Sequence, residues 1–203
     1  DLKTPLSPVK GYAELLLSSG KTEEEQCRRY ASVILKNASY METLIDDLKL
    51  VYQLKNGILP LHPVNQNMVR FLKELAIDIL NIPEYERRIL HFECTIETIT
   101  YPFDQTLMTR ALRNLIINAF EHGGETTEVT LRLVPSGISL KIYVSDNGKG
   151  MEPETVNHLF ERYYRGTGAG QKAEGTGLGL AIAKNIIELH RGTISVSSAP
   201  SAG

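Results

Sequence analysis

The sequence is poor in the features that mark several large classes of protein. Its 203 residues include only two cysteines, Cys27 and Cys94, which are too few for a disulfide framework and favour a reducing compartment. No apolar run approaches the roughly 20 residues that a membrane-spanning helix needs. The first twenty residues contain charged side chains and two prolines, so they do not have the pattern of a signal peptide. The chain as written is expected to be soluble.

A strong excess of charge of one sign is also absent. The formal net charge is -2 at pH 7, the isoelectric point is near 6.3, and the lysines and arginines are scattered along the chain. This distribution provides no basic surface, so we expect no nucleic-acid partner. With 42% hydrophobic and 23% charged residues, the chain can bury a sizeable core in one or two globular domains.

The first 54 residues have a helical period. Apolar residues recur at steps of three and four between Leu2 and Leu16 and again between Cys27 and Tyr52, with Ser-Ser-Gly at residues 18–20. The pattern predicts an antiparallel helical hairpin with a coiled-coil-like seam. Such a hairpin has little core of its own, so two copies are expected to form a four-helix bundle. The alternative is that the hairpin packs against the rest of the same chain.

A second domain is predicted over residues 65–203, after a linker over residues 55–64. One-sided strands alternating with helices imply a two-layer α/β sandwich, so the whole chain is expected to be of the α+β class. The expected helices cover residues 68–80, 104–122 and 178–190, and the expected strands cover residues 90–95, 98–101, 129–134, 138–144 and 194–196.

Two glycine-rich motifs lie in this second domain. Residues 146–150 (Asp-Asn-Gly-Lys-Gly) follow an alternating strand, and residues 175–180 (Gly-Thr-Gly-Leu-Gly-Leu) open a helix. A carboxylate before a glycine turn can accept a hydrogen bond from a ligand, and glycines at a helix start let backbone N–H groups approach phosphate. A P-loop and a dinucleotide fingerprint are both excluded, because the required residues and spacing are missing. The two motifs predict a nucleotide held between a turn and a lid.

The predicted lid covers residues 151–175, between the two motifs. It begins with a short helix expected over about residues 153–164. The glycine-rich stretch at residues 166–172 has little to bury and is expected to be mobile. A plain loop without a lid function is the alternative.

Two asparagines lie one helical turn apart on the helix predicted over residues 104–122. Asn114 and Asn118 share a polar face with Glu121, opposite the apolar face. Asparagine inside a helix is unfavourable, because its side chain competes for backbone hydrogen bonds. Two interpretations stay open: solvated surface amides, or amide oxygens that bind magnesium.

Taken together, these motifs resemble those of the sensor histidine kinases. Residues 114–122 resemble the N box, residues 146–150 the G1 box, residues 159–165 the F box and residues 175–180 the G2 box, in the family's order and spacing. Residues 1–7 resemble the H box without its first residue, and the hairpin resembles the dimerisation and histidine-phosphotransfer domain. The resemblance covers essentially the whole chain.

The resemblance implies an ATP-binding sandwich of the histidine kinase, gyrase and chaperone type, with magnesium as a cofactor. Asp146 would accept the adenine amino group, while Gly148 and Gly150 would let the backbone pass close to the base. Asn118 would hold magnesium with help from Asn114. The remaining residues implied at the nucleotide are His122, Arg165, Gly175, Thr176, Gly177, Leu178 and Gly179.

Glu121 departs from the family pattern. Many relatives have a lysine at this position, where it meets the terminal phosphate, and a carboxylate there would repel triphosphate unless it points away or binds a metal-bound water. Lys149, Arg162 and Lys172 are the alternatives for supplying the missing positive charge. His122 is near enough to contribute, or it is simply a surface histidine at a helix end.

Asp1 and Thr4 are the residues that the resemblance places in catalysis. The family's phosphorylated histidine would lie just before Asp1, on the outward face of the hairpin. Asp1 would accept the imidazole proton, so that a ring nitrogen is free to attack the γ-phosphate. Thr4 would orient a water for dephosphorylation of the partner, or it is an ordinary N-cap before a proline.

The resemblance thus predicts the cytoplasmic catalytic core of a two-component sensor kinase, an enzyme that phosphorylates a histidine with Mg-ATP. The phosphoryl group would then pass to an aspartate on the receiver domain of a response regulator. The partners would be a second copy, through the hairpin, and that regulator, with a membrane reached only through the parent protein. Two alternatives stay open: an ATP-driven conformational switch on the same fold, or a dimeric interaction module whose kinase activity has decayed.

Overall fold

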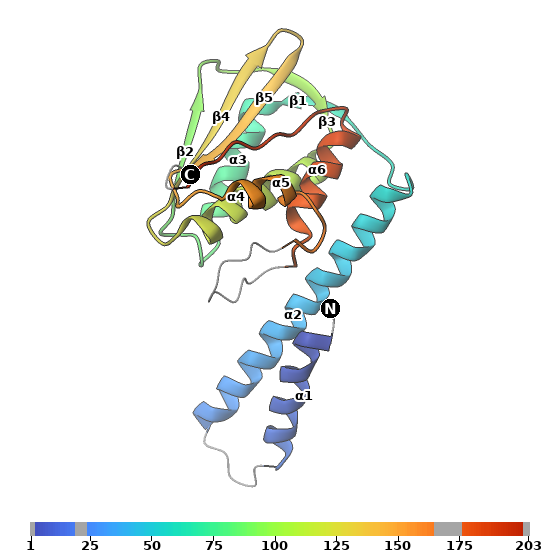
Figure 1. Ribbon diagram of the computed structural model, residues 1–203, viewed down its shortest axis with the longest axis vertical. Coiled ribbons are helices and arrows are strands. Elements are labelled where there is room, and N and C mark those ends of the chain that lie inside the picture. The colour runs from blue at the N-terminus through green and yellow to red at the C-terminus, as the bar shows by residue number, and fades with distance from the viewer. Residues whose placement is uncertain (1–2, 19–23, 165–175, 201–203) are drawn as a thin grey trace. The chain divides into compact units, whose positions relative to one another are not determined.

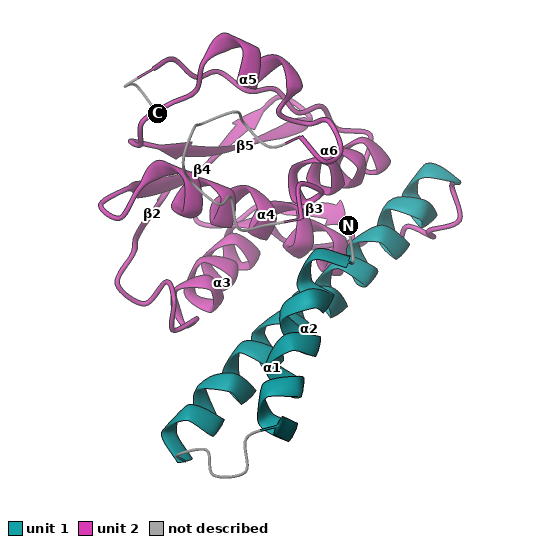
Figure 2. Ribbon diagram, turned by 60° about the horizontal axis from the view of Figure 1, so that its bottom comes forward, with its two compact units in different colours: residues 1–56 teal, residues 57–203 magenta. Residues whose placement is uncertain are grey.

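The chain divides into two compact units. The computed structural model describes residues 3–18, 24–164 and 176–200. The units are Asp1–Asn56 and Gly57–Gly203, coloured separately in Figure 2. In the described part of the chain, no helix is both long enough and apolar enough to cross a membrane.

The first unit is a pair of helices, α1 (Lys3–Ser18) and α2 (Glu24–Lys55). They run side by side (Figure 1), and the rings of Tyr12 and Tyr30 meet across them with their centroids 5.3 Å apart. The predicted helical amino-terminal region is confirmed. Formation of a four-helix bundle by two copies stays a prediction.

Two residues of the predicted seam of α2 are exposed within the single chain. Ile45 is 53% exposed and Tyr52 is 63% exposed, although the heptad pattern places both in the seam. Leu44, Leu50 and Val51 in the same half of α2 are buried instead. Burial within the single chain thus falls on a different face of this half of the helix from the predicted seam.

The second unit contains two small sheets (Figure 1). In the larger one, β4 (Glu128–Ser136) lies between β2 (Ile89–Cys94), with which it is parallel, and β5 (Ser139–Asp146), with which it is antiparallel. The smaller sheet pairs β1 (Val64–Asn67) with β3 (Thr100–Phe103) in antiparallel fashion.

Helices cover one face of the larger sheet and bury the core of this unit. They are α3 (Met68–Leu80) and α4 (Gln105–Gly123), and α6 (Gly179–Leu189) packs beside α4. The short α5 (Pro153–His158) follows β5 in the sequence. The amphipathic pattern explains the layering, because alternate residues of the strands and one stripe of each helix are apolar. The two-layer α/β sandwich is confirmed. Fully buried core side chains are Leu72, Ile79, Ile116, Phe120, Val129, Leu131 and Leu133.

The helix that the N box was predicted to occupy is fixed at its start by a network around Asp104. The Asp104 carboxylate accepts from the backbone N–H of Leu107, as an N-cap, and from the backbone N–H of His62. The backbone N–H of Asp104 donates to Nε2 of His190, 3.0 Å away, and Nδ1 of His190 lies 2.8 Å from the Ile186 carbonyl oxygen. This network ties the end of α6 to the start of α4.

Three local predictions differ from the structure. Residues 193–200 form no strand, although Ile194 and Val196 alternate with polar residues and are half-buried. Alternation specifies a face to bury, whereas a strand also needs a partner for its backbone. The short helix after the first glycine motif ends at His158, and β1 lies partly in the segment interpreted as a linker.

Candidate functional site

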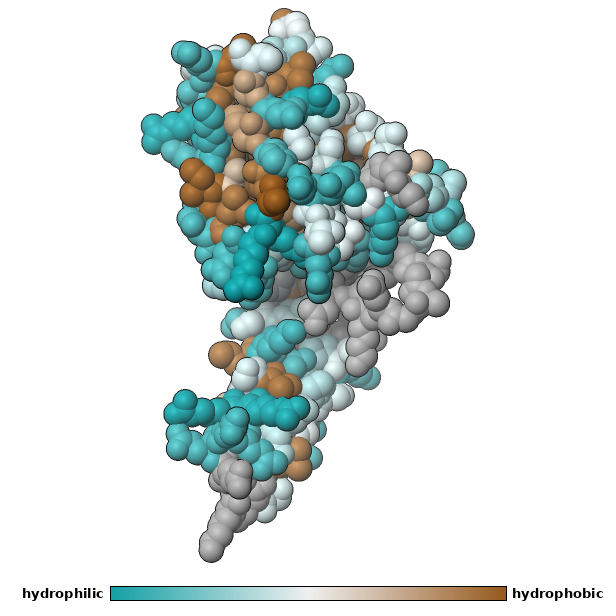
Figure 3. Space-filling view, turned by 90° about the vertical axis from the view of Figure 1, so that its left-hand side faces the viewer, coloured by the Kyte–Doolittle hydropathy of each residue, from teal (hydrophilic) through white to brown (hydrophobic). Residues whose placement is uncertain are grey.

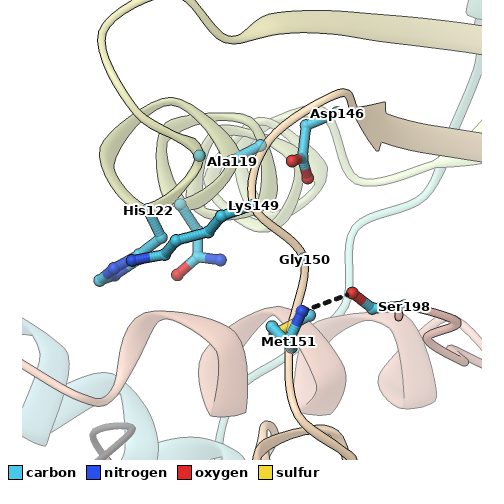
Figure 4. A pocket seen from close by; sticks show the side chains of 9 residues that line it. Ala119, His122, Asp146, Lys149, Gly150, Met151 and Ser198 are labelled. Atoms are coloured by element: carbon cyan, nitrogen blue, oxygen red, sulfur yellow. Dashed lines mark hydrogen bonds between the residues drawn. The ribbon is translucent and has the colours of Figure 1, made fainter. Parts of the chain in front are cut away.

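A pocket opens beside the carboxyl-terminal half of α4 (Figure 4). Its walls come from α4, from the turn after β5 and from the irregular carboxyl-terminal segment. It combines amide, carboxylate, imidazole and ammonium groups with apolar surface. The residues that line it are Asn118, Ala119, His122, Gly123, Asp146, Lys149, Gly150, Met151 and Ser198.

The turn after β5 holds Asp146 in the pocket wall. The backbone N–H of Gly148 donates to Oδ1 of Asp146 at 2.9 Å, and the Asn147 side chain accepts from the backbone N–H of Glu128 at 2.8 Å. A Cβ atom at Gly148 would lie 2.5 Å from the Cα of Gly123, so only glycine lets this turn approach α4. Gly150 has φ +68°, which also favours glycine.

The two asparagines of the N box have different surroundings. Asn118 lines the pocket. Asn114 is not among the lining residues, and its side-chain nitrogen donates to the carbonyl oxygen of Gly179 at 2.9 Å. A Cβ atom at Gly179 would lie 3.4 Å from the Asn114 amide carbon. Asn114 therefore joins α4 to the start of α6.

The second glycine motif forms the entry into α6. The backbone N–H of Leu178 donates to the Thr176 hydroxyl at 3.1 Å, and Leu178 itself is fully buried. The carbonyl oxygen of Gly177 accepts from the backbone N–H of Tyr163 at 2.8 Å. Gly177 has φ +66°, and a Cβ atom there would lie 3.1 Å from the Tyr163 Cα. The second glycine motif thus packs closely against Tyr163, near the end of the F box.

Glu121 turns away from the pocket. Its carboxylate accepts a hydrogen bond from the hydroxyl of Tyr85 at 3.0 Å, and it is not a lining residue. Burial of the phenol and the negative charge of Glu121 raise the pKa of Tyr85 to about 12. The Tyr85 ring stacks on Phe120, with centroids 5.7 Å apart. The Glu121 carboxylate therefore avoids repulsion with a bound triphosphate by pointing away from the pocket.

The candidates for positive charge are separated by the structure. Lys149 lines the pocket beside His122, and Figure 4 shows its side chain extending towards the imidazole ring. Arg162 is exposed and does not line the pocket. Lys172 lies outside the described residues, as do Asp1, Arg165, Gly175 and the glycine-rich part of the predicted lid.

Thr4 is the second described residue of α1 and is exposed. Because the helix already includes Lys3, the N-cap interpretation of Thr4 does not describe this structure. Pro8 lies inside the same helix. Because proline has no backbone N–H, the helical hydrogen bond that the Thr4 carbonyl oxygen would accept from residue 8 is missing.

Met151 and Ser198 belong to the pocket wall but were not found by sequence reasoning. The backbone N–H of Met151 donates to the Ser198 hydroxyl at 2.9 Å (Figure 4). Ser198 lies in a segment of small polar residues with no motif, so no local signal marks it.

The side chains of the pocket decide which metal ion could bind there. Within residues 3–18, 24–164 and 176–200, no three His, Cys, Asp or Glu side chains gather as a metal site. The Asn118 amide oxygen is a hard ligand of the kind that magnesium accepts, together with waters and substrate phosphates. The donor set therefore fits a cation that arrives with a phosphorylated substrate.

Both units match known protein families. Residues 1–57 match the His Kinase A (phospho-acceptor) domain. Residues 103–203 match the Histidine kinase-, DNA gyrase B-, and HSP90-like ATPase family. The chain belongs to the sensor histidine kinases. The second match also shows that its α/β sandwich is an ATP-binding domain.

Relatives of this sensor histidine kinase agree with that placement. The sensor histidine kinase YvrG of Bacillus subtilis (strain 168) is 40% identical over 204 residues, covering 100% of this chain and 35% of the relative. The chain thus spans about a third of that protein's length. The pairing of both domains in one chain does not favour the switch and decayed-module alternatives.

Solved structures show the same fold. The histidine kinase AdeS of Acinetobacter baumannii superposes with a TM-score of 0.77 at 20% identity, covering 98% of this chain and 91% of that chain. The histidine kinase ThkA, in complex with the response regulator protein TrrA, superposes with a TM-score of 0.73 at 20% identity. That match covers 94% of this chain and 52% of that chain.

Proposed function

We propose that this chain transfers the γ-phosphoryl group of Mg-ATP to a histidine and then to an aspartate of a response regulator. The observation that carries the proposal is the pocket beside α4, where Asp146, Asn118 and His122 meet. A hydrogen-bond acceptor, an amide oxygen and an imidazole in one cleft suit a base at one end and phosphates at the other.

The base would lie at the Asp146 end. A carboxylate there accepts the hydrogen bond of an exocyclic amino group, which favours adenine over a base with a carbonyl at that position. The close approach of Gly148 to Gly123 supports this role, because it keeps the Asp146 turn against α4. The second domain, residues 65–203, would therefore be the catalytic domain, with residues 151–175 as its lid.

The phosphates would lie along α4, between its last turn and the start of α6. Asn118 would offer its amide oxygen to magnesium. The Asn114 bond to Gly179 uses the amide nitrogen, so only its oxygen could serve the same cation. Magnesium, when bound, supplies positive charge to the phosphate oxygens. Arg165, Thr176, Leu178 and the glycines at 175, 177 and 179 would complete the phosphate site.

The phosphotransfer step uses the opening of the chain. A histidine before Asp1 would attack the γ-phosphorus through one ring nitrogen, and the bond to the bridging oxygen would break, releasing ADP. The proton on the other ring nitrogen would pass to the Asp1 carboxylate. The exposed Thr4 would orient a water that hydrolyses the phosphoaspartate of the regulator, releasing inorganic phosphate and the free carboxylate.

The hairpin, residues 1–54, would be the dimerisation and phosphotransfer domain. Apolar side chains reach its surface (brown, lower half of Figure 3), and Leu17 and Leu35 are 89% and 68% exposed. A second copy would cover such side chains in a four-helix bundle. The receiver domain of a response regulator would be the second partner of this chain, and the histidine kinase ThkA has been solved in complex with the response regulator protein TrrA. The parent protein would be a membrane-anchored sensor with this part in the cytoplasm.

Nucleotide binding and labelling test the proposal. The wild-type chain is expected to bind Mg-ATP, and Asn118→Ala to abolish magnesium-dependent binding in calorimetry. Asn37→Ala is the matched control, because Asn37 is also a helical asparagine but does not line the pocket; its side-chain nitrogen donates to the Val33 carbonyl oxygen at 2.8 Å. A chain extended by one histidine before Asp1 should incorporate γ-phosphate in acid-labile, alkali-stable form. An acid-stable phosphoester would overturn the histidine mechanism.

A further inference from the structure

Lys149 lies in the first glycine motif and is one of the three residues that the sequence offers as a source of the positive charge missing at Glu121. We propose that its ammonium group binds the terminal phosphates of the nucleotide and supplies the positive charge that is missing at Glu121. This inference rests on the proposed ATP site. It adds a residue that determines affinity for the phosphates.

The first argument is the distribution of charge along the pocket. Asp146 and Lys149 both come from the turn after β5 and both line the pocket. In Figure 4 the Lys149 side chain extends away from Asp146 and ends beside the ring of His122. One end of the pocket is thus anionic and the other carries an ammonium and an imidazole. A ligand with a neutral base and an anionic tail matches that polarity.

The second argument is the helix end on which this part of the pocket is built. His122 lies in the last turn of α4, which ends at Gly123. Carbonyl groups at a helix carboxyl end carry negative partial charge and disfavour anions nearby. A phosphate near His122 therefore needs a cation to offset that charge.

The third argument is that neighbouring charged groups are directed elsewhere. Arg88 donates to the carbonyl oxygens of Gly124 and Glu125 just after α4, and Glu121 is held by Tyr85. Among the described residues, Lys149 is the only lysine or arginine that lines the pocket. It forms no ion pair with another described side chain. Its charge is therefore not compensated within that part of the chain.

The test measures binding of adenosine, ADP and ATP to the full chain by calorimetry, each with magnesium. Lys149→Met is expected to weaken ATP binding about tenfold, the size of one charge-assisted hydrogen bond, and to leave adenosine binding within about twofold. Lys149→Arg keeps the charge and should retain most of the ATP affinity. Lys141→Met is the matched control, because Lys141 is an exposed lysine earlier on β5.

The possible outcomes distinguish a failure of the proposed role of Lys149 from a failure of the proposed ATP site. Wild-type affinity for ATP in Lys149→Met overturns the role of Lys149 but leaves the proposed ATP site standing. An equal loss for adenosine and ATP also overturns it, because the lysine would then only shape the turn. If the wild-type chain binds none of the three ligands, the proposed function and this inference both fail. Thermal unfolding of each variant checks that the fold is intact.

Discussion

The sandwich and the helical hairpin are stabilised in different ways. The sandwich buries a contiguous core of its own, in which Leu72, Ile116 and Leu131 have no exposed surface. The hairpin instead leaves Leu17 and Leu35 largely exposed. Burial of apolar surface is the main favourable term in folding, so the sandwich has a source of stability that the hairpin alone lacks.

This difference bears on function. A binding pocket such as that around Asn118 and Asp146 needs fixed walls, because binding groups must be held in place before the ligand arrives. The core of the sandwich provides such walls through α4 and β5. The hairpin would gain order through association with a second copy, and its stability would then depend on concentration.

Separation of the two units gives the largest expected effect. Residues 57–203 alone should keep their secondary structure and unfold cooperatively. Residues 1–56 alone should lose helical signal on dilution, because dissociation of the proposed dimer would expose apolar side chains such as Leu35. Circular dichroism at protein concentrations from micromolar to nanomolar checks this. A hairpin whose helicity is the same at every dilution would contradict the comparison.

A pair of leucine substitutions sharpens the comparison within the full chain. Leu72→Ala removes a fully buried side chain and should lower the free energy of unfolding of the sandwich by about 3 kcal/mol. Leu35→Ala removes a side chain that is 68% exposed and should change the stability of the single chain by less than about 0.5 kcal/mol. It should weaken dimerisation instead. Urea unfolding and analytical ultracentrifugation measure the two effects, and equal losses of stability would refute the distinction.

The hydrogen bonds of His190, which link the end of α6 to the start of α4, should affect the stability of the sandwich but not that of the hairpin. His190→Ala removes both side-chain bonds of His190, to the Asp104 N–H and the Ile186 carbonyl, and should destabilise by about 1 to 3 kcal/mol. His62→Ala is the control, because His62 uses only its backbone N–H towards Asp104. Denaturant unfolding checks both variants. A loss as large in His62→Ala would contradict the assigned role.

The smallest expected effect concerns Tyr85. Its hydroxyl bonds to Glu121, and its pKa is raised from 10.0 to about 12, so Tyr85→Phe should cost about 1 kcal/mol near neutral pH. Between pH 10 and 12 the unfolded chain loses the phenolic proton while the folded chain keeps it. The free energy of unfolding therefore falls as pH rises, and Tyr85→Phe should remove part of that fall.

Urea unfolding at several alkaline pH values measures the slope. Tyr143→Phe serves as the control, because Tyr143 makes its described contact through its ring, 5.0 Å from the Arg132 guanidinium. If Tyr85→Phe and the wild-type chain lose stability equally with pH, burial and Glu121 do not raise the pKa of Tyr85 in the folded chain.

Local signals made part of the fold predictable. The helix predicted over residues 68–80 has those bounds in α3, because its apolar stripe is regular and Asn67 caps its start. The hairpin of β4 and β5 turns at Gly137, where φ is +63°, as the Pro-Ser-Gly sequence indicates. The requirement for glycine at Gly148, in contrast, comes from the close approach of Gly123, which lies far away in the sequence.

Contacts between distant segments were not predictable in the same way. The parallel pairing of β2 with β4 aligns Ile89 with Glu128, and nothing in either strand specifies the other. The apolar alternation near Ile194 indicated a strand that did not form, because pairing depends on a free neighbouring backbone edge. Ser198 reaches the pocket through Met151, 47 positions earlier.

By itself, the sequence determined the order of the helices, most of the strands and the family motifs, because period, capping and glycine spacing are local properties. The tertiary structure alone decided where the side chains of those motifs point. Glu121 faces Tyr85, which is 36 positions away, and Asn114 faces Gly179, which is 65 positions away. A side chain's direction is set by the neighbours that surround it, and those neighbours come from parts of the chain that only folding brings together.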